Sequence, residues 1–250
     1  MSYIGTTEIG GMFLGYTEIE KAYLGSTLVY EKAGEIPGSL LTDYVQNGLW
    51  LHLDGKSKGG TTTWVDKVSG YTFSKNSGVT FNKDHIYFNG VNGYLSLYKA
   101  GWSSQPARNA GIIEVVYDNE NLGTAASTII IFPTNSKICG YINASREFVY
   151  NADNATGRAE YPPILTTAKA SVSVSKDRAF ENGVELSWGS TKRMLNDVTA
   201  NYSYIGRSKS GYYFKGKIYS IRIYSRKLTQ AEVLQNLSVD NLRFNLGLTL

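Results

Sequence analysis

The residue types that carry out acid–base chemistry are few in this chain and poorly spaced for it. Asp118 and Glu120 come nearest to carboxylates alternating along a strand, but they fall in an expected loop. His52 and His85 are the two histidines, and each lies in an expected strand, where a structural role is more common than that of a general base. Gly-rich segments are expected turns and do not open a helix, as a phosphate cradle requires. We therefore expect that this chain is not an enzyme.

Two oxygen-rich segments are candidates for holding calcium. Ca²⁺ binds carboxylate, amide and carbonyl oxygens that converge from loops. The two segments contain Asp118, Glu120 and Asn121, and Asn151, Asp153 and Asn154. Solvated loops carry the same residues without an ion, so the sequence leaves both interpretations open. No other cofactor is indicated.

Aromatic residues in expected loops are suited to sugar binding. Exposed rings stack on sugar faces, while amides and charged groups beside them bond the hydroxyls. The candidate glycan-binding residues are Trp102, Arg108, Asn154, Arg158, Tyr161, Trp188, Arg207, Tyr212 and Tyr213. The alternative for each is a partly buried residue at the rim of the fold. The sequence does not say which of them converge.

Short apolar segments separated by turn residues predict the elements that must position these side chains. The chain has 26 glycines and 19 tyrosines, a composition typical of strands and tight turns. Asn182-Gly183 suits a type I′ hairpin turn. Many short strands at this spacing indicate an all-β sandwich or barrel. The expected strands are 48–53, 71–74, 85–88, 94–97, 111–117, 128–132, 138–142, 148–151, 169–175, 178–181, 184–186, 201–205 and 215–224.

One helix is expected near the C-terminus. Thr229 and Glu232 have the spacing of a capping box, in which each side chain bonds the backbone of the other. Val233, Leu234 and Leu237 follow at helical spacing. The polar residues from 236 to 238 predict the end of the helix there.

The first thirty residues repeat with a period of ten. Residues 3–9, 13–19 and 23–29 each read aromatic, aliphatic, Gly, any residue, Thr, a polar or aliphatic residue, and a β-branched residue. Gly-x-Thr is turn chemistry, and the runs between the turns favour strands. The simplest prediction is a four-stranded meander with strands at 2–4, 8–14, 18–24 and 28–32.

This repeat is too small to bury its own apolar surface. Below ~40 residues a chain usually needs disulfides, metals or oligomerisation, and Cys139 is the single cysteine. We expect an assembly module at 1–32, a linker at 33–39 and a main domain at 40–250. The alternative is a ribbon that only packs on that domain. The predicted assembly residues are Tyr3, Ile9, Phe13, Ile19, Tyr23 and Val29.

Charge and hydropathy exclude several partners. The net charge is +4 and no Lys/Arg-rich run occurs, so we expect no nucleic-acid partner. No stretch approaches the ~20 apolar residues of a membrane span, and the first residues lack the basic start and apolar core of a signal peptide. We expect synthesis in the cytoplasm and no membrane partner.

Several motifs resemble those of laminin-G-like, concanavalin A-like domains. They are Gly206-Arg207, Tyr213 to Tyr224, Lys227 to Asn236, Gly48 to Asp54 with Trp64 to Asp66, and Tyr87 to Leu95. The resemblance covers residues 40–244 and implies a two-sheet antiparallel jelly-roll sandwich with one short C-terminal helix, here preceded by the small β-repeat. It also implies recognition of glycans or glycosylated surfaces. The carboxylate motif of the laminarinase-type members does not occur in this chain.

The N-terminal repeat resembles the openings of virion proteins of tailed phages and prophages of gut bacteria. This resemblance implies a head or tail fibre or decoration protein that is made in the host cytoplasm and works in the virion. We expect a homo-oligomer that binds other virion proteins through residues 1–32 and displays a lectin-like domain to host-surface glycans. The alternatives are an extracellular carbohydrate-binding or adhesion module of a secreted bacterial protein and, third, a glycoside hydrolase.

Overall fold

The computed structural model divides the chain into two compact units, Met1–Asp43 and Tyr44–Leu250. No helix among the described residues is long and apolar enough to cross a membrane. The described residues are 3–4, 7–8, 13–14, 17–18, 21–24, 27–31, 44–98, 112–132, 138–142, 144–151, 164–175, 178–187, 202–208 and 211–248.

The first unit contains three small hairpins, one in each repeat. Each hairpin is a separate two-stranded sheet. The strand pairs are β1 (Tyr3–Ile4) with β2 (Thr7–Glu8), β3 (Phe13–Leu14) with β4 (Thr17–Glu18), and β5 (Lys21–Leu24) with β6 (Thr27–Glu31).

Strand pairing in this unit lies within a repeat and not between repeats. Ile4 pairs with Thr7, Leu14 with Thr17 and Leu24 with Thr27, so two residues separate the paired strands each time. These two residues are the Gly-x of each repeat, where the sequence predicts a turn, and they lie outside the described residues. The predicted four-stranded meander is replaced by six shorter strands, because each repeat closes its own ladder. Of the predicted assembly residues, Ile9 and Ile19 lie outside the described residues, and the others lie in strands.

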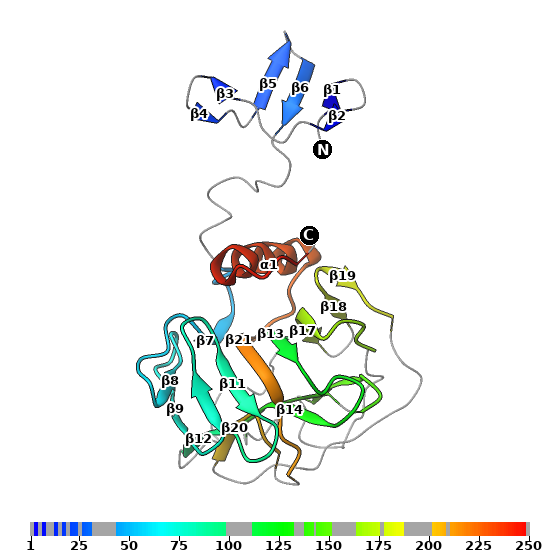
Figure 1. The fold of residues 1–250 in the computed structure, drawn as a ribbon. Coiled ribbons are helices and arrows are strands. Elements are labelled where there is room, and N and C mark those ends of the chain that lie inside the picture. The colour runs from blue at the N-terminus through cyan, green and yellow to red at the C-terminus, as the bar shows by residue number, and fades with distance from the viewer. Residues whose placement is uncertain are drawn as a thin grey trace. The chain divides into compact units, whose positions relative to one another are not determined.

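The second unit is a sandwich of two antiparallel sheets, which confirms the predicted all-β class (Figure 1). The eight-stranded sheet contains β7 (Leu49–Asp54), β10 (Val79–Phe81), β11 (Ile86–Asn89), β13 (Ile112–Asn119), β17 (Lys169–Ser175), β18 (Ala179–Glu181), β19 (Val184–Glu185) and β21 (Lys215–Tyr224). The seven-stranded sheet contains β8 (Thr63–Val65), β9 (Thr72–Lys75), β12 (Leu95–Tyr98), β14 (Ser127–Phe132), β15 (Ile138–Ile142), β16 (Phe148–Asn151) and β20 (Tyr202–Ile205).

Strand order places β21 at the centre of the larger sheet. The order is β10-β11-β21-β13-β17-β18-β19, and β7 pairs with the second half of β21 beyond β11. Gly216 lies in the half of β21 that pairs with β11, where β21 and β13 approach closely. It has φ of 128°, and a Cβ there would lie 2.0 Å from the carbonyl oxygen of Asp118. The smaller sheet has the order β16-β15-β14-β20-β12-β9-β8.

The main core lies between the two sheets. Alternate residues of each strand point inward, as period-two packing requires. Leu51, Val115 and Ile221 enter the core from the larger sheet, and Phe73 and Ile205 enter it from the smaller sheet; all are fully buried. The residues between them face outward from each sheet and are available for other contacts.

Helix α1 (Gln230–Phe244) packs on the outer face of the larger sheet (Figure 1). Thr229 and Glu232 form the predicted capping box, and Asn245 ends the helix in the left-handed conformation. The helix therefore continues past the predicted end at 236–238. Asn236, Ser238 and Asp240 are buried. Asn236 and Asp240 face the sheet and bond Glu114 and Arg222, whereas the Ser238 hydroxyl donates to the Leu234 carbonyl of the same helix.

The Asn-Gly steps of the sequence have two different outcomes. Asn182 and Gly183 have φ of 51° and 77° and connect β18 to β19, which confirms the predicted hairpin. The segment from Asn89 to Gly93 instead passes from one sheet to the other. The Asn89 side-chain oxygen accepts hydrogen bonds from the backbone of Val91, Asn92 and Gly93. The short strands β8 and β10 were not predicted, whereas the equally short β18 and β19 were, because the Asn-Gly turn between them marks a hairpin.

Candidate functional site

Outward-facing tyrosines gather on the smaller sheet, where β12 and β20 pair. Leu95 and Ile205 face the core from these strands, so the residues that alternate with them face away from it. Tyr98 lies directly opposite Tyr202, and Ser96 lies opposite Tyr204. The exposed fractions of Tyr98 and Tyr202 are 59% and 43%. Both rings are therefore accessible to a ligand.

The rings form a continuous surface. The ring centroids of Tyr98 and Tyr202 lie 5.0 Å apart, and those of Tyr202 and Tyr204 lie 6.0 Å apart with planes only 6° from parallel. Tyr94, just before β12, meets Tyr204 edge-on at 5.8 Å. We call Tyr94, Tyr98, Tyr202 and Tyr204, together with Arg207, the tyrosine platform.

Arg207 sits at one end of the tyrosine platform among three rings. Its guanidinium carbon lies 4.5 Å from the ring centroid of Tyr94, 5.0 Å from that of Tyr204 and 5.9 Å from that of Tyr213. Such cation–π contacts hold the guanidinium in place while leaving its edge free to bond. A backbone bridge between Arg207 and Tyr213 fixes the position of the turn.

The backbone beside Arg207 can be built only with glycine. Gly206 has φ of 86°, and a Cβ on it would lie 2.4 Å from the Phe88 ring. Phe88 is fully buried and packs edge-on against Phe214. The packing of Gly206 against the core thus fixes the position of the Arg207 backbone next to the tyrosines.

Tyr212 extends the aromatic surface beyond the tyrosine platform. Its ring is 44% exposed and lies 5.8 Å from the ring of Tyr141 on β15. Ser208 supports this turn, because its hydroxyl accepts a hydrogen bond from the Tyr212 backbone. Polar groups lie beside the rings as well, since Asn76 donates a hydrogen bond to the Ser96 hydroxyl at 3.0 Å.

The structure gathers three of the nine predicted glycan-binding residues. Arg207 and Tyr213 are in contact, and Tyr212 adjoins them. Six predicted residues lie outside the described residues, namely Trp102, Arg108, Asn154, Arg158, Tyr161 and Trp188. The sequence prediction missed Tyr94, Tyr98, Tyr202 and Tyr204. The signal was present in Tyr202-Ser203-Tyr204, where alternation on a strand puts both rings on the face opposite a buried serine.

The first predicted calcium segment has its carboxylates engaged by lysines. Lys217 lies 3.2 Å from the Asp118 carboxylate, and Lys215 lies 3.4 Å from that of Glu120. In the described ranges, no group of three His, Cys, Asp or Glu side chains gathers in a way that could hold a metal. The structure thus lends no support to calcium at Asp118, Glu120 and Asn121. In the second segment Asp153 and Asn154 lie outside the described residues, and Asn151 ends β16.

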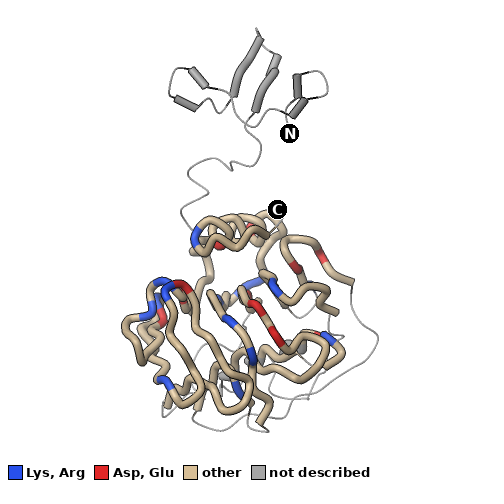
Figure 2. Tube along the Cα trace, viewed as in Figure 1, with Lys and Arg blue, Asp and Glu red and all other residues tan. Residues whose placement is uncertain are grey.

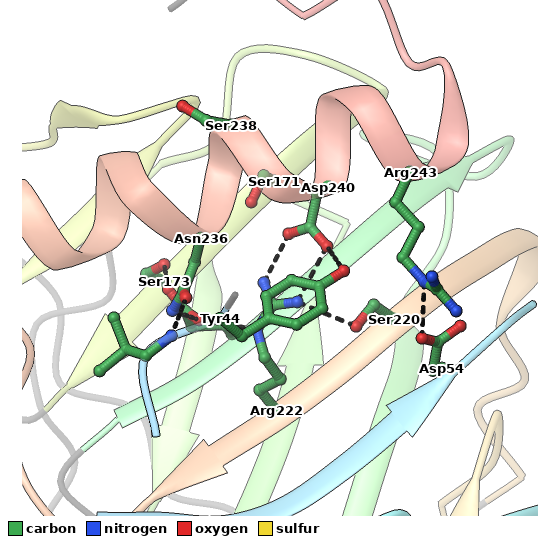
Figure 3. Close-up of polar contacts among 12 residues, drawn as sticks. Tyr44, Asp54, Ser171, Ser173, Ser220, Arg222, Asn236, Ser238, Asp240 and Arg243 are labelled. Atoms are coloured by element: carbon green, nitrogen blue, oxygen red, sulfur yellow. Dashed lines mark hydrogen bonds and ion pairs between the residues drawn. The ribbon is translucent and has the colours of Figure 1, made fainter. Parts of the chain in front are cut away.

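A buried polar network joins α1 to the larger sheet (Figure 3). Arg222 lies at its centre, between the carboxylates of Glu114 and Asp240, and all three side chains are at most 1% exposed. Arg222 Nε donates to Glu114 at 3.0 Å, and its Nη1 and Nη2 donate to the two oxygens of Asp240 at 2.8 and 2.5 Å. The bidentate pairing compensates the buried charges.

Neutral side chains satisfy the remaining atoms of this network. Glu114 also accepts from Ser173 at 2.7 Å and from Asn236 at 2.6 Å. Tyr44 donates to Asp240 at 2.9 Å, and its ring covers the Arg222 guanidinium at 4.4 Å. Burial raises the pKa of Glu114 above its ordinary value, while the charge of Arg222 opposes that shift. Helix α1 covers these carboxylates, so their role here is to hold the helix on the sheet.

The two histidines differ in their surroundings. Burial, and after it the charge of Arg222, lowers the pKa of His52 to about 3, so this imidazole is neutral. It packs edge-on against Tyr44 at 4.7 Å. His85 lies 2.7 Å from the neighbouring carboxylate of Asp84. His52 lies on β7 of the larger sheet, and His85 lies immediately before β11.

Comparison with solved structures places this chain among known β-sandwich folds. It matches Trypanosoma rangeli sialidase with a TM-score of 0.52 at 14% identity, over 78% of this chain and 33% of that chain. The same sialidase with the inhibitor DANA gives 0.54 at 13% identity, over 84% and 36%. The receptor-binding domain of botulinum neurotoxin type G gives 0.50 at 16% identity, over 78% and 52%. No family model and no curated protein matches the chain.

The sialidase likeness corrects one prediction. We expected that the chain is not an enzyme, and that expectation is contradicted because several of the structures it resembles are enzymes. At 13–15% identity the likeness shows a shared fold, and this chain spans about a third of the sialidase chain. The botulinum likeness shows that the same sandwich also occurs in a receptor-binding domain.

Proposed function

We propose that the jelly-roll unit is a recognition module that binds a surface glycan on the tyrosine platform. The observation that carries this proposal is the exposed run of rings from Tyr98 to Arg207 on paired strands. Clustered exposed aromatic rings mark binding surfaces, because each is a large apolar area left in contact with water. Sugar rings offer apolar faces for stacking and hydroxyls for polar groups such as Ser96. The shared fold with a receptor-binding domain is compatible with this role.

For the whole chain we propose a structural component of a phage virion. In this proposal residues 1–32 anchor the protein by binding its own copies and other virion proteins, and the jelly roll is displayed to the host surface. Three hairpins with strands of two to five residues support it, since isolated hairpins are marginally stable in water and gain from assembly. The alternative is an adhesion module of a secreted bacterial protein.

Charge along the described jelly roll agrees with a ligand other than nucleic acid. Figure 2 shows basic and acidic residues interleaved and no uniform basic stripe. Nucleic-acid binding relies on clustered Lys and Arg that neutralise phosphates. We therefore propose neither nucleic acid nor a membrane as a partner.

A glycan array with the purified chain tests the recognition role. We expect binding to at least one glycan class and its loss in Tyr202→Ala, because that ring contacts both Tyr98 and Tyr204. Tyr87→Ala is the matched control, since Tyr87 is a partly exposed strand tyrosine on the other sheet. Failure of all glycans to bind, or equal loss in both variants, would reject the proposed site.

Sialosides belong in the same array because of the sialidase likeness. Binding and release of sialic acid are both measured there, so that a catalytic turnover is detected if it occurs. Release that survives Tyr202→Ala would locate the activity away from the tyrosine platform.

Mass spectrometry of purified phage particles from the encoding strain tests the virion role. We expect peptides of this chain to be recovered with the particle in fixed proportion to other structural proteins. Recovery of the other structural proteins without this one would contradict the virion proposal and leave the secreted alternative.

A further inference from the structure

The tyrosine platform is an elongated surface along two strands. From Tyr94, just before β12, to Tyr98 at its end, the platform spans four residue steps, or about 13 Å at roughly 3.3 Å per residue. The rings follow one another at centroid distances of 5.0, 6.0 and 5.8 Å. A single sugar ring covers only one such step. A surface of this length is therefore suited to several consecutive sugars.

Arg207 gives this surface a charged end. Within the described part of the chain, no carboxylate lies within ion-pair distance of its guanidinium. Its Nε donates to the Ser208 carbonyl at 3.3 Å, and in those same ranges its Nη groups have no hydrogen-bond partner. Three tyrosine rings partly exclude water from it. A guanidinium that is fixed, partly desolvated and without an acidic partner in the described ranges is suited to donate hydrogen bonds to a ligand carboxylate.

We infer that the tyrosine platform binds an internal stretch of a linear acidic polysaccharide, with a sugar carboxylate at Arg207 and the following sugars stacked along Tyr204, Tyr202 and Tyr98. This inference rests on the proposed glycan-binding function and names its ligand class. It differs from recognition of one terminal acidic sugar, for which Arg207 and its neighbouring rings would suffice and the far end of the tyrosine platform would add nothing.

Titration calorimetry on the full chain tests the inference. The probes are size-defined oligosaccharides of linear uronate polymers, sulfated linear polymers and their neutral counterparts, with free sialic acid as a terminal-sugar probe. We expect affinity for a uronate series to rise with the number of sugars and to level off once the tyrosine platform is covered. Equal affinity for a monosaccharide and a long oligosaccharide would overturn it.

Arg207→Gln tests the charged end. We expect the affinity for the uronate oligosaccharide to fall at least about tenfold, since a hydrogen bond to a charged group is lost, and the affinity for neutral ones to change little. Arg178→Gln is the matched control, because Arg178 is an exposed arginine over an aromatic ring, Phe180, on the other sheet. If the wild type bound sulfated or neutral oligosaccharides more strongly than uronates, the proposal that Arg207 binds a sugar carboxylate would be rejected.

Tyr98→Ala tests the far end independently, even if the Arg207 variant folds poorly. We expect weaker binding of long oligosaccharides and unchanged binding of the shortest ones that bind. Equal weakening of both would overturn the extended mode. Binding of a protein partner at these tyrosines, with no glycan bound at all, would reject the proposed function itself and is thereby distinguished from failure of the ligand class alone.

Discussion

The guanidinium groups of Arg222 and Arg207 lie in opposite surroundings. Arg222 is 1% exposed and meets two carboxylates, whereas Arg207 emerges among tyrosine rings on the smaller sheet. Buried charge requires compensation, so the first arginine stabilises the fold only as long as both acids remain. The second has no acidic partner among the described residues, and we propose that it binds a carboxylate of a ligand.

Removing the Arg222 charge is expected to be strongly destabilising. Arg222→Leu leaves Glu114 and Asp240 buried without a counter-charge, which costs about 3–5 kcal/mol of unfolding free energy. Urea unfolding at pH 7 measures this value, with Glu185→Gln as a control at an exposed ion pair where little change is expected. A loss below about 1 kcal/mol for Arg222→Leu would show that the network does not hold the helix.

At the residue scale, the sequence groups those side chains whose neighbours are local. Arg207, Tyr212 and Tyr213 stand close together in sequence, and the turn keeps them together in space. Tyr98 and Tyr202 are brought together only by pairing of distant strands, which no local pattern encodes. Arg222 lies within an alternating apolar run, so its buried partners on other elements could not be read from that run.

For helix α1, the sequence predicted the start correctly but not the end. Thr229 and Glu232 form the cap as predicted, because the capping box is a local motif. The predicted end at 236–238 was wrong, because the helix continues to Phe244 with Asn236 and Asp240 turned toward the sheet. Their bonds to Glu114 and Arg222 on the sheet replace the bonds that would otherwise favour a helix end. Strand positions were largely predicted, since burial of one face imposes a strict alternation.

The helix cap is expected to weaken in acid. Hydrogen bonds from Arg226, and after them from Thr229, lower the pKa of Glu232 from 4.5 to about 2. A lowered carboxylate pKa stabilises the fold fully above pH 4.5, and this contribution is lost as the pH falls toward 2. Glu232→Gln should therefore cost about 1 kcal/mol near neutral pH, with the difference from wild type vanishing near pH 2. Unfolding titrations across this range measure it, and a pH-independent difference would contradict the assignment.

At the scale of the whole molecule, two units are built on different principles. Tyr44–Leu250 has its own closed core, whereas Met1–Asp43 contains three separate hairpins in the described residues. The sequence predicted the sandwich because many short alternating strands have few alternative folds. It did not predict that each repeat pairs within itself, since the same turn chemistry permits a meander.

Truncation is expected to separate folding from assembly. A chain of residues 44–250 should unfold with the same urea midpoint as the full chain, because its core is complete. It should be monomeric, whereas the full chain should self-associate through the repeats. Light scattering measures both masses; a monomeric full chain, or a fragment that associates equally, would reject the assembly role of residues 1–32.

Tyr44 and Val45, the first residues of the second unit, are both hydrogen-bonded to helix α1. Tyr44 donates to Asp240, and the backbone of Val45 donates to Asn236 at 2.9 Å. A mechanical pull on the chain ahead of Tyr44 would thus load these two bonds and the helix before it reached any strand. The force would be transmitted into the layer between α1 and the larger sheet. The smaller sheet, which carries the tyrosine platform, would bear little of it.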